Sequence, residues 1–388
     1  MHSPPFTYGV LGTRVGKAIA HFLASLPDTA QVYITDIGRT EARAAAYDIN
    51  TALRYTDKKC VGVDFDATKD SVQDFLANFP EISVIVSATS TSFSFKLAEA
   101  AIESQRHFLD LGGVVEVTKN LMSLDQAAKT ANVSVIPDNG LMPGTGLVFM
   151  RLLLYLFDSA KNIWVTVGGV PQRPVPPLFY ALPFAMEGLR HLCCDQAPIL
   201  ERGAIRLADP FSYAGEIQIP ELKPFHNKGW VEAFITAGTS IAPWTMQTLG
   251  VQNFWKRTIR WPGFIKGVKD ISPKNFEKEI KPLLMPDISA ENPDIVWMKV
   301  EAQIAKNGNL AARASFTLFD LFDHDTGLSA MRRTTGFSAG IMAHLAALGK
   351  TKTGVATPDL ALTLKNIGEY MEELQKHFSI TWKYQNLE

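Results

Sequence analysis

The chain has 388 residues, of which 46% are hydrophobic and 20% are charged, and its formal net charge is −1. This composition is typical of a globular protein with two or three domains, and the balanced charge excludes the broad basic surface of a nucleic-acid-binding protein. The chain has 3 cysteines, two of them adjacent, and no C-x-x-C pair, which argues against a disulfide framework or a structural metal site. No signal-peptide pattern opens the sequence, and the most apolar stretch, 147–157, is too short to span a membrane. We therefore expect a cytoplasmic protein without a metal, nucleic-acid or membrane partner.

The first elements predict a dinucleotide-binding βαβ unit. A strand over 6–11 leads into a glycine turn, a helix over 17–26 follows, and a second strand over 31–35 ends at Asp36. Such a turn presents backbone N–H groups at a helix N-terminus, where a pyrophosphate is stabilised. An acid at the end of the second strand binds a ribose 2′-OH and repels a 2′-phosphate. The pattern predicts NAD as the cofactor, and Arg39, which could hold a 2′-phosphate, keeps NADP as the alternative.

The glycine turn departs from the usual G-x-G-x-x-G pattern. It is one residue shorter and lacks the middle glycine, so a purely structural βα turn is the alternative interpretation. We expect the cofactor contacts of the first two strands at Gly12, Thr13, Arg14, Val15, Gly16, Asp36 and Ile37.

Strands and helices continue to alternate up to about residue 148. Strands are predicted at 60–65, 82–86, 107–110 and 133–138, and helices at 40–55, 71–78, 95–104 and 121–131. Six strands with helical crossovers predict an α/β fold, a Rossmann-type doubly wound parallel sheet. Ligands bind such sheets outside the carboxyl ends of the strands, where further cofactor contacts are expected at Asp66, Ala67, Ala88, Thr89 and Asp110.

From about residue 160 the pattern changes to strands in series. Strands are predicted at 163–169, 229–238 and 257–261, and a hairpin joins 294–304 to 310–319 through Asn307-Gly308. This section predicts an inserted α+β domain. Two helices follow, at 334–348 and 359–377, and the first is rich in small residues that permit close packing.

Several segments together resemble the saccharopine dehydrogenase-like family, and within it the lysine 6-dehydrogenases most closely. They are Asp110–Gly113, Pro137–Gly144, Val167–Gln172, Pro176–Tyr180, Thr258–Gly263, Met331–Phe337 and Gly354–Pro358. The resemblance implies a Rossmann domain over 1–148, an α+β catalytic and oligomerisation domain over 149–328, and C-terminal helices over 329–388 that return to the Rossmann domain. It also implies a substrate cleft between the domains and a homodimer or homotetramer, with 297–319 as the expected contact segment.

The chemistry implied by the family is NAD(P)-dependent oxidation at a C–N bond of lysine or a lysine-like amino acid. One alternative is a reductive condensing enzyme of the saccharopine reductase or carboxynorspermidine synthase type. A second alternative, from another class, is a nucleotide-binding protein without catalytic turnover.

An amino-acid substrate needs a cation for its carboxylate and an acid or base for its amine. We expect Arg260 to bind the carboxylate, with an ion pair inside the domain as the alternative. Asp138 or Glu187 is expected at the amine, with two alternatives: Asp138 only caps the turn before Gly140, and Glu187 is exposed on a helix. Tyr180 is expected to donate a hydrogen bond to the substrate or to be a core aromatic.

Basic residues cluster around Arg260 in the sequence. The neighbouring basic residues are expected to form a solvated face of the domain, and they are Lys256, Arg257, Lys266 and Lys269.

Overall fold

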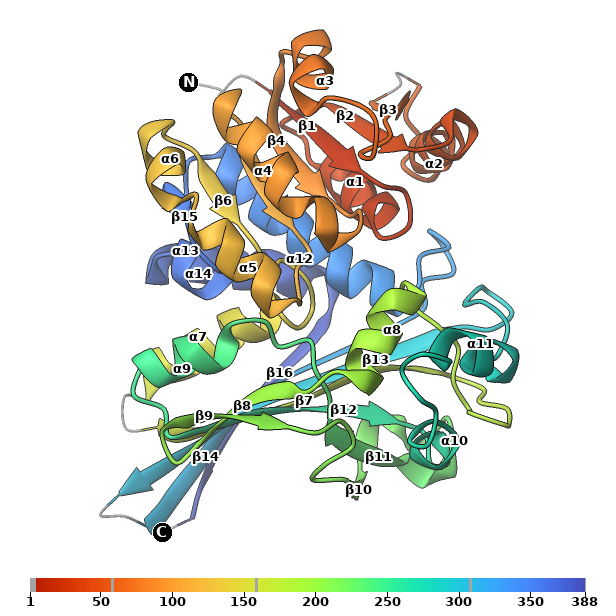
Figure 1. Cartoon of the computed structure of the whole chain (residues 1–388), viewed down its shortest axis with the longest axis vertical. Helices are drawn as coiled ribbons and strands as arrows, with labels where there is room; N and C mark the ends of the chain where they lie inside the picture. The colour runs from red at the N-terminus through yellow and green to blue at the C-terminus, as the bar shows by residue number, and fades with distance from the viewer. Residues whose placement is uncertain (1–4, 57–58, 158–159, 307–308, 388) are drawn as a thin grey trace. The chain divides into compact units, whose positions relative to one another are not determined.

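The computed structural model of the chain describes residues 5–56, 59–157, 160–306 and 309–387. It divides into two compact units (Figure 1). The first unit comprises Met1–Val148 and Arg332–His377, and the second comprises Phe149–Met331 and Phe378–Glu388. Each unit is built on its own sheet.

The first unit is a parallel sheet with helical crossovers. Its elements up to residue 136 are β1 (Phe6–Leu11), α1 (Gly16–Ser25), β2 (Thr29–Asp36), α2 (Arg39–Ala52), β3 (Cys60–Asp64), α3 (Val72–Asn78), β4 (Ile82–Ser87), η1 (Thr91–Phe93), α4 (Ser94–Glu103), β5 (His107–Asp110), α5 (Val115–Met122), α6 (Asp125–Thr130) and β6 (Ser134–Ile136). The strand order is β15-β6-β5-β4-β1-β2-β3, and every pairing is parallel. The predicted Rossmann-type doubly wound sheet is thus confirmed.

The C-terminal part of the chain contributes four elements that complete the first unit. They are α12 (Ala330–Ala347), which begins two residues before the boundary of this unit, β15 (Gly354–Val355), α13 (Pro358–Ala361) and α14 (Leu364–His377). β15 pairs with β6 and adds a seventh strand that the sequence did not predict. The small residues of α12 bring it close to α1, since a Cβ at Gly336 would lie 2.7 Å from Cβ of Ala18.

The second unit is built on a mixed sheet. Its elements are α7 (Thr145–Leu156), which starts in the first unit, β7 (Ala160–Pro171), α8 (Met186–Cys194), β8 (Ala197–Glu201), β9 (Ala204–Ala208), β10 (Gly215–Gln218), η2 (Pro220–Leu222), η3 (Asn227–Gly229), β11 (Trp230–Ile235), α9 (Ala242–Thr248), β12 (Asn253–Arg260), α10 (Phe264–Val268), α11 (Phe276–Ile280), η4 (Lys281–Leu283), β13 (Asp294–Lys306), β14 (Asn309–Leu321) and β16 (Ser379–Asn386). The strand order is β10-β11-β12-β7-β13-β14-β16, with β8 and β9 attached through β12. β12 and β7 are parallel and the other pairs are antiparallel, so the predicted α+β architecture is confirmed.

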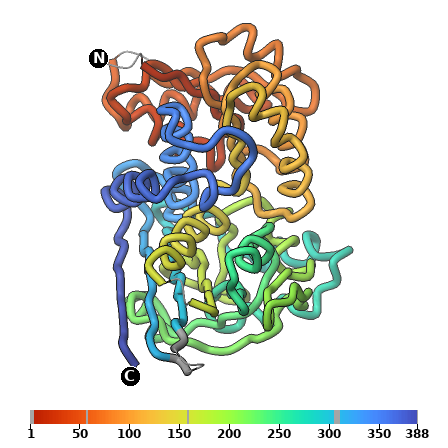
Figure 2. Tube along the Cα trace, turned by 90° about the vertical axis from the view of Figure 1, so that its left-hand side faces the viewer, coloured from red at the N-terminus to blue at the C-terminus, as the bar shows by residue number. Residues whose placement is uncertain are grey.

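The last strand corrects one expectation. Residues 329–388 were expected to be helices of the Rossmann domain, but β16 pairs with β14 at the edge of the second sheet (Figure 2). The cause is visible in the sequence, because Ile380, Trp382 and Tyr384 alternate with polar residues. The ring of Trp382 packs 4.8 Å from that of Phe316 on β14 and stacks 6.2 Å from that of Phe157.

Two other predictions differ in detail. The helix expected over 121–131 is divided into α5 and α6, and the one expected over 359–377 is divided into α13 and α14. The hairpin of β13 and β14 is longer at both ends than predicted, and its predicted turn at Asn307-Gly308 lies outside the described residues.

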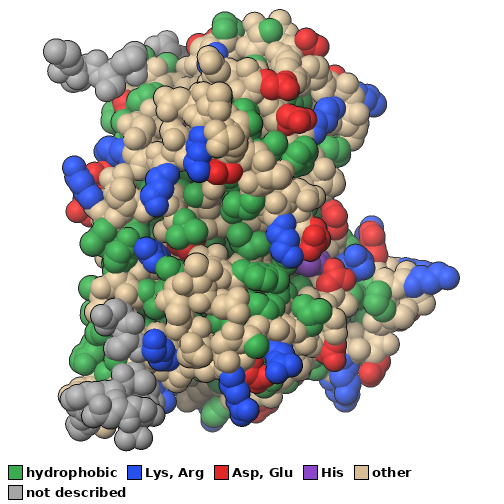
Figure 3. Space-filling model, turned by 60° about the vertical axis from the view of Figure 1, so that its left-hand side comes forward, with side chains coloured by type: hydrophobic (Ala, Val, Ile, Leu, Met, Phe, Trp, Pro, Cys, Tyr) green, Lys and Arg blue, Asp and Glu red, His purple; other side chains and the backbone are tan. Residues whose placement is uncertain are grey.

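Within the ranges that the structure describes, no helix combines the length and the apolar character that a membrane crossing requires. Acidic and basic side chains are interspersed on the face drawn in Figure 3, as the net charge of −1 suggests. No single sign of charge dominates that face.

Replacing Gly336 by valine is expected to destabilise the first unit. The new side chain would meet Cβ of Ala18 at 2.7 Å and the backbone nitrogen of Ile19 at 2.9 Å, so α1 and α12 would have to separate. Overpacking of this kind costs about 1–3 kcal/mol of unfolding free energy. Chemical denaturation followed by circular dichroism measures the loss. Gly368→Ala on α14 is the control, because nothing lies within 4 Å of its new Cβ and helical alanine is favoured over glycine. Equal stability of Gly336→Val and the wild type would contradict the close packing.

Candidate functional site

The glycine turn after β1 packs tightly against the end of β4. Gly12 has a φ of +94°, and a Cβ there would lie 2.9 Å from the carbonyl oxygen of Ala88. Gly16 faces β1, with Cγ1 of Val10 only 3.1 Å from where its Cβ would be. Glycine is therefore needed at Gly12 for both its conformation and its surroundings, and the short turn still has a well-defined shape.

The turn leaves backbone donors free at the start of α1. The N–H groups of Arg14 and Val15 make no hydrogen bond with any residue in the described ranges, whereas the N–H of Gly12 donates to the carbonyl of Thr35 at 2.9 Å. Free N–H groups at a helix N-terminus, together with the helix dipole, stabilise a phosphate anion. The turn therefore fits the pyrophosphate of a dinucleotide.

Asp36 connects the end of β2 to the glycine turn. Its Oδ2 accepts the N–H of Thr13 at 3.0 Å and also the Thr13 hydroxyl, and its Oδ1 accepts the N–H of Ile37 at 2.8 Å. Each carboxylate oxygen has two lone pairs, so Oδ2 is fully used by Thr13, whereas Oδ1 retains acceptor capacity for a ribose hydroxyl. The side chain of Ile37 is 71% exposed at this edge.

The other residues expected at the cofactor gather along the same edge of the sheet. The N–H of Ala88 donates to the carbonyl of Leu11 at 2.8 Å, and the hydroxyls of Thr89 and Ser87 lie 2.9 Å apart. Beyond β2, Asp66 and Ala67 are half-buried in the segment that follows β3. Parallel strands bring these positions together because their carboxyl ends meet at one edge.

Asp66 and Arg39 already have partners at this edge. Hydrogen bonds from the hydroxyl and N–H of Thr68 are the main cause that lowers the pKa of Asp66. The guanidinium Nε of Arg39 lies 3.7 Å from Oδ2 of Asp64, and both side chains are largely exposed. Arg39 is therefore an exposed cation three residues after the end of β2, where it could attract a 2′-phosphate.

Asp110 and Asp138 form a buried network behind this edge. Oδ1 of Asp110 accepts the N–H of Asp138 at 3.0 Å, and burial raises the pKa of Asp110. Asp138 has a φ of +67° and is fully buried. Its Oδ1 accepts the N–H of Gly113 at 2.8 Å, and the Thr118 hydroxyl lies 3.2 Å from both of its carboxylate oxygens. The Asp138 carboxylate thus holds the Gly112-Gly113 loop, which is a different segment from the turn before Gly140 that the alternative interpretation named.

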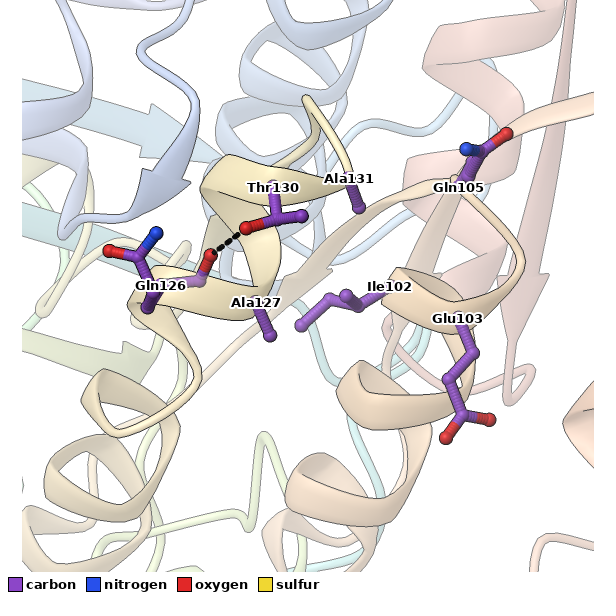
Figure 4. A pocket seen from close by; sticks show the side chains of 7 residues that line it. All are labelled: Ile102, Glu103, Gln105, Gln126, Ala127, Thr130 and Ala131. Atoms are coloured by element: carbon purple, nitrogen blue, oxygen red, sulfur yellow. Dashed lines mark hydrogen bonds between the residues drawn. The ribbon is translucent and has the colours of Figure 1, made fainter.

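A hollow of about 590 Å³ lies elsewhere on the first unit, between the ends of α4 and α6 (Figure 4). Its lining residues are Ile102, Glu103, Gln105, Gln126, Ala127, Thr130 and Ala131. They precede β5 and β6, so the hollow opens at the amino ends of the strands, opposite the edge that binds ligands in such folds. It has one charged side chain and no convergent polar groups, and we assign it no catalytic role.

In the second unit, one face of β12 carries buried cations. Positions 254, 256, 258 and 260 alternate along the strand and are all buried, whereas Trp255 and Arg257 on the other face are half-buried. The buried face therefore holds Lys256 and Arg260, which are 4% and 3% exposed. A strand normally buries its apolar face, so two cations on this face are unusual and make it a candidate site.

Arg260 is held in place by neutral groups. Its Nη1 donates to the carbonyl of Ile259 at 2.7 Å and its Nη2 to the Tyr180 hydroxyl at 3.2 Å. The guanidinium lies 4.4 Å from the centre of the Tyr180 ring, and room is left by Gly168, whose Cβ would be 3.2 Å from Nη1. Nε is buried without a hydrogen-bond partner. No carboxylate in the described ranges lies within 4 Å of the guanidinium, so the alternative of an ion pair inside the domain is not what the structure shows.

Lys256 corrects a second expectation. It was assigned to a solvated basic face, but it is buried, and its Nζ donates to the carbonyl of Ala237 at 2.6 Å. Burial, with a smaller contribution from Arg260, lowers the pKa of Lys256 to about 7. Sequence reasoning missed this residue because it weighed the cluster by charge alone. Phe254, Lys256 and Thr258 alternate along the strand, and this alternation indicates that Lys256 lies on the same face as the apolar Phe254.

The structure joins Tyr180 to this cluster but leaves Glu187 outside it. Tyr180 is fully buried, and burial raises its pKa to about 12, so it is a neutral hydrogen-bonding group. Cys193 on α8 is also buried, and burial likewise raises the pKa of its thiol to about 12. Glu187 is exposed in the first turn of α8, whose buried side carries Leu189 and Cys193. Within the described ranges, no group of three or more metal-ligating side chains is found.

Two family models match consecutive parts of the chain. Residues 9–136 match the model of the saccharopine dehydrogenase NADP binding domain, and residues 140–380 match the saccharopine dehydrogenase C-terminal domain. The saccharopine dehydrogenase (L-Glu forming) of Saccharomyces cerevisiae has a similar structure, with a TM-score of 0.76, 15% identity, and coverage of 99% of this chain and 100% of that one. A myo-inositol dehydrogenase from Corynebacterium glutamicum is 12% identical over 97% of this chain and 98% of that one. Its TM-score is 0.44, which supports no further conclusion.

The yeast likeness shows the fold, and the two family models together cover nearly the whole chain in the expected order. They support the expected class, an oxidoreductase with a nucleotide-binding Rossmann domain. The chain belongs to the saccharopine dehydrogenase family.

Proposed function

We propose that the protein is an NAD-dependent oxidoreductase that acts on a C–N bond of lysine or a lysine-like amino acid. The observation that carries this proposal is the buried guanidinium of Arg260, which has a free Nε and no carboxylate partner in the described ranges. A buried guanidinium is a strong partner for a carboxylate, which every amino-acid substrate supplies. The nucleotide-binding edge of the first unit supports the redox part of the proposal.

The chain's own residues then have three tasks. When bound, the nicotinamide supplies the hydride acceptor. Arg260 binds and orients the substrate carboxylate, and Tyr180 keeps the guanidinium in place through its hydroxyl and ring. The substrate amine has to lose its proton before hydride can leave, since an ammonium has no lone pair. Asp138 and Glu187 remain the proposed groups at the amine, although Asp138 is engaged in its loop and Glu187 is exposed.

Two alternatives have distinct assays. A reductive condensing enzyme would consume NADPH with an aldehyde and an amino acid, and it would show little oxidation of L-lysine with NAD. A nucleotide-binding protein without turnover would gain thermal stability from the nucleotide and show neither reaction. Reduction of NAD in the presence of L-lysine, followed by absorbance, favours the main proposal.

We also propose a homodimer or homotetramer formed through the second unit. The segment expected to mediate contact, 297–319, lies in β13 and β14 inside the sheet, and Trp297 is only 6% exposed. The edge strand β16 is a better candidate, because Trp382 and Tyr384 are 42% and 53% exposed on it.

NAD(H) is expected to bind more tightly than NADP(H). The carboxylate of Asp36 stands where the second strand ends, and it would repel a 2′-phosphate while accepting from a 2′-OH. Titrations of NAD, NADH, NADP and NADPH at equal salt measure the difference in affinity between the two cofactors. The Asp36→Ala variant should show a smaller difference in affinity. Asp74→Ala is the control, because it removes an exposed acid of the same unit away from the turn. Tighter binding of NADP(H) than of NAD(H) to the wild type would contradict the role assigned to Asp36.

Replacing Arg260 by lysine is expected to reduce kcat/KM for L-lysine. The ammonium keeps the charge but loses the planar fork, and loss of a charge-assisted hydrogen bond costs about 1.5–3 kcal/mol, roughly ten- to a hundred-fold. The dissociation constant for the nucleotide should not change. Arg257→Lys, on the opposite face of β12, is the matched control and should retain kcat/KM. A purely structural Arg260 would instead lower the melting temperature of the variant and leave KM unaltered.

A further inference from the structure

The second unit buries two positive side chains on one face of β12, and neither has a carboxylate partner within 4 Å in the described residues. Lys256 and Arg260 lie on the same face of β12 and are 4% and 3% exposed. Arg260 also lowers the pKa of Lys256, so the two charges interact. Moving one unpaired charge out of water is costly, and two like charges in one low-dielectric site repel each other as well. Such an arrangement is stable only if one cation gives up its proton or an anion enters.

The surrounding groups offer no negative charge. The thiol of Cys193 on α8 and the phenol of Tyr180, from the segment before α8, both have pKa values raised to about 12 by burial. Ala237, in the loop after β11, contributes a backbone carbonyl to Nζ of Lys256. Glu232 lies opposite Arg260 in the register of β11 and β12, but its carboxylate accepts the N–H groups of Gly263 and Ile265 at 2.9 and 3.0 Å. Neither cation has a carboxylate within 4 Å in the described part of the chain.

An arginine cannot relieve this conflict by losing its proton, whereas a lysine can. Arg260 is therefore always positively charged, and Lys256 is the residue that can become neutral. With a pKa of about 7, Lys256 is mostly a neutral amine in the free protein at slightly alkaline pH. The hydrogen bond from Nζ to the Ala237 carbonyl is available to the amine and to the ammonium alike.

We propose that Lys256 and Arg260 together bind one anionic group, the carboxylate of the substrate, and that Lys256 takes up a proton when this group arrives. The proposal rests on the role proposed above for Arg260. A buffer acid in the solvent gives up the proton and becomes its conjugate base, the proton forms an N–H bond with the Nζ lone pair, and the incoming carboxylate then meets two cations. A substrate without a carboxylate would gain neither contact, which makes Lys256 a specificity-determining residue for amino acids over simple amines.

The test measures protons bound per ligand. Hexanoate is the probe, because it carries a carboxylate and no amine that could titrate, and hexan-1-ol is its uncharged counterpart. Isothermal titration calorimetry in two buffers of different ionisation enthalpy gives the proton uptake. At pH 8 a group with a pKa of about 7 is about nine-tenths neutral. The protein should therefore take up about 0.9 proton for each hexanoate bound at pH 8, and about 0.1 proton at pH 6. Addition of hexan-1-ol should cause no proton uptake by the protein at either pH.

Three variants separate the contributions. Lys256→Met should abolish the pH 8 uptake and weaken hexanoate binding about tenfold or more. Lys256→Arg should also abolish the uptake, because arginine stays protonated, but it should retain more of the affinity. Lys266→Met removes an exposed lysine of α10 in the same unit and should behave as the wild type.

Stability distinguishes a binding role from a structural one. The pKa of Lys256 is lowered in the folded protein, so the unfolded chain binds more protons between about pH 7 and the ordinary lysine pKa near 10.4. The unfolding free energy of the wild type minus that of Lys256→Met should therefore increase as the pH is raised across this range. A structural Lys256 would make Lys256→Met the less stable protein at pH 7 and leave the proton uptake unchanged.

The outcomes also separate this inference from the proposed reaction. Proton uptake on hexanoate binding without oxidation of L-lysine would retain the anion site and reject the reaction. Oxidation of L-lysine by a wild-type protein that binds hexanoate with no proton uptake would retain the reaction and overturn the role of Lys256. Absence of any binding heat for hexanoate at tens of millimolar would overturn the anion site itself.

Discussion

Unpaired positive charge inside the second unit is the constraint around which its centre is arranged. A cation removed from water has to be compensated by an anion, by hydrogen bonds or by loss of a proton. The fold provides hydrogen bonds for Arg260 through a carbonyl and a phenol, and a carbonyl for Lys256, but no carboxylate within 4 Å in the described residues. A protein that only needed stability would fill this space with apolar side chains. The retained charges are best explained by a ligand that carries the missing negative charge.

The neighbouring elements make this arrangement feasible. β12 lies between β11 and β7 in the interior of the sheet, so both of its backbone edges are hydrogen-bonded within the sheet. Gly168 on β7 leaves room for the guanidinium, and the Tyr180 ring covers it from a segment without regular secondary structure. The phenol is kept neutral by its own burial. Positioning and desolvation thus come from groups distant in sequence, and only the charges come from β12 itself.

In the first unit the constraint is a different one, because the backbone of the glycine turn has to come close to an anion. Its glycine turn is shorter than the common pattern, yet it still packs onto β4 and leaves the N–H groups of Arg14 and Val15 free. Asp36 stiffens the turn through Thr13 while it retains acceptor capacity at the edge of the sheet. The sheet's parallel register then aligns the ends of β4 and β5 with this turn.

Local patterns in the sequence were sufficient for the doubly wound sheet, the glycine turn and the long β13–β14 hairpin, because alternation, helical spacing and turn residues act over short distances. The sequence alone left open what surrounds Arg260, and it misassigned Lys256 to the surface and Ser379–Asn386 to the helical part. Those features depend on which face of β12 is buried and on which edge strand the C-terminal segment pairs with. Only the tertiary structure decides them, since burial, the resulting pKa of Lys256 and strand pairing are set by residues far away in the chain.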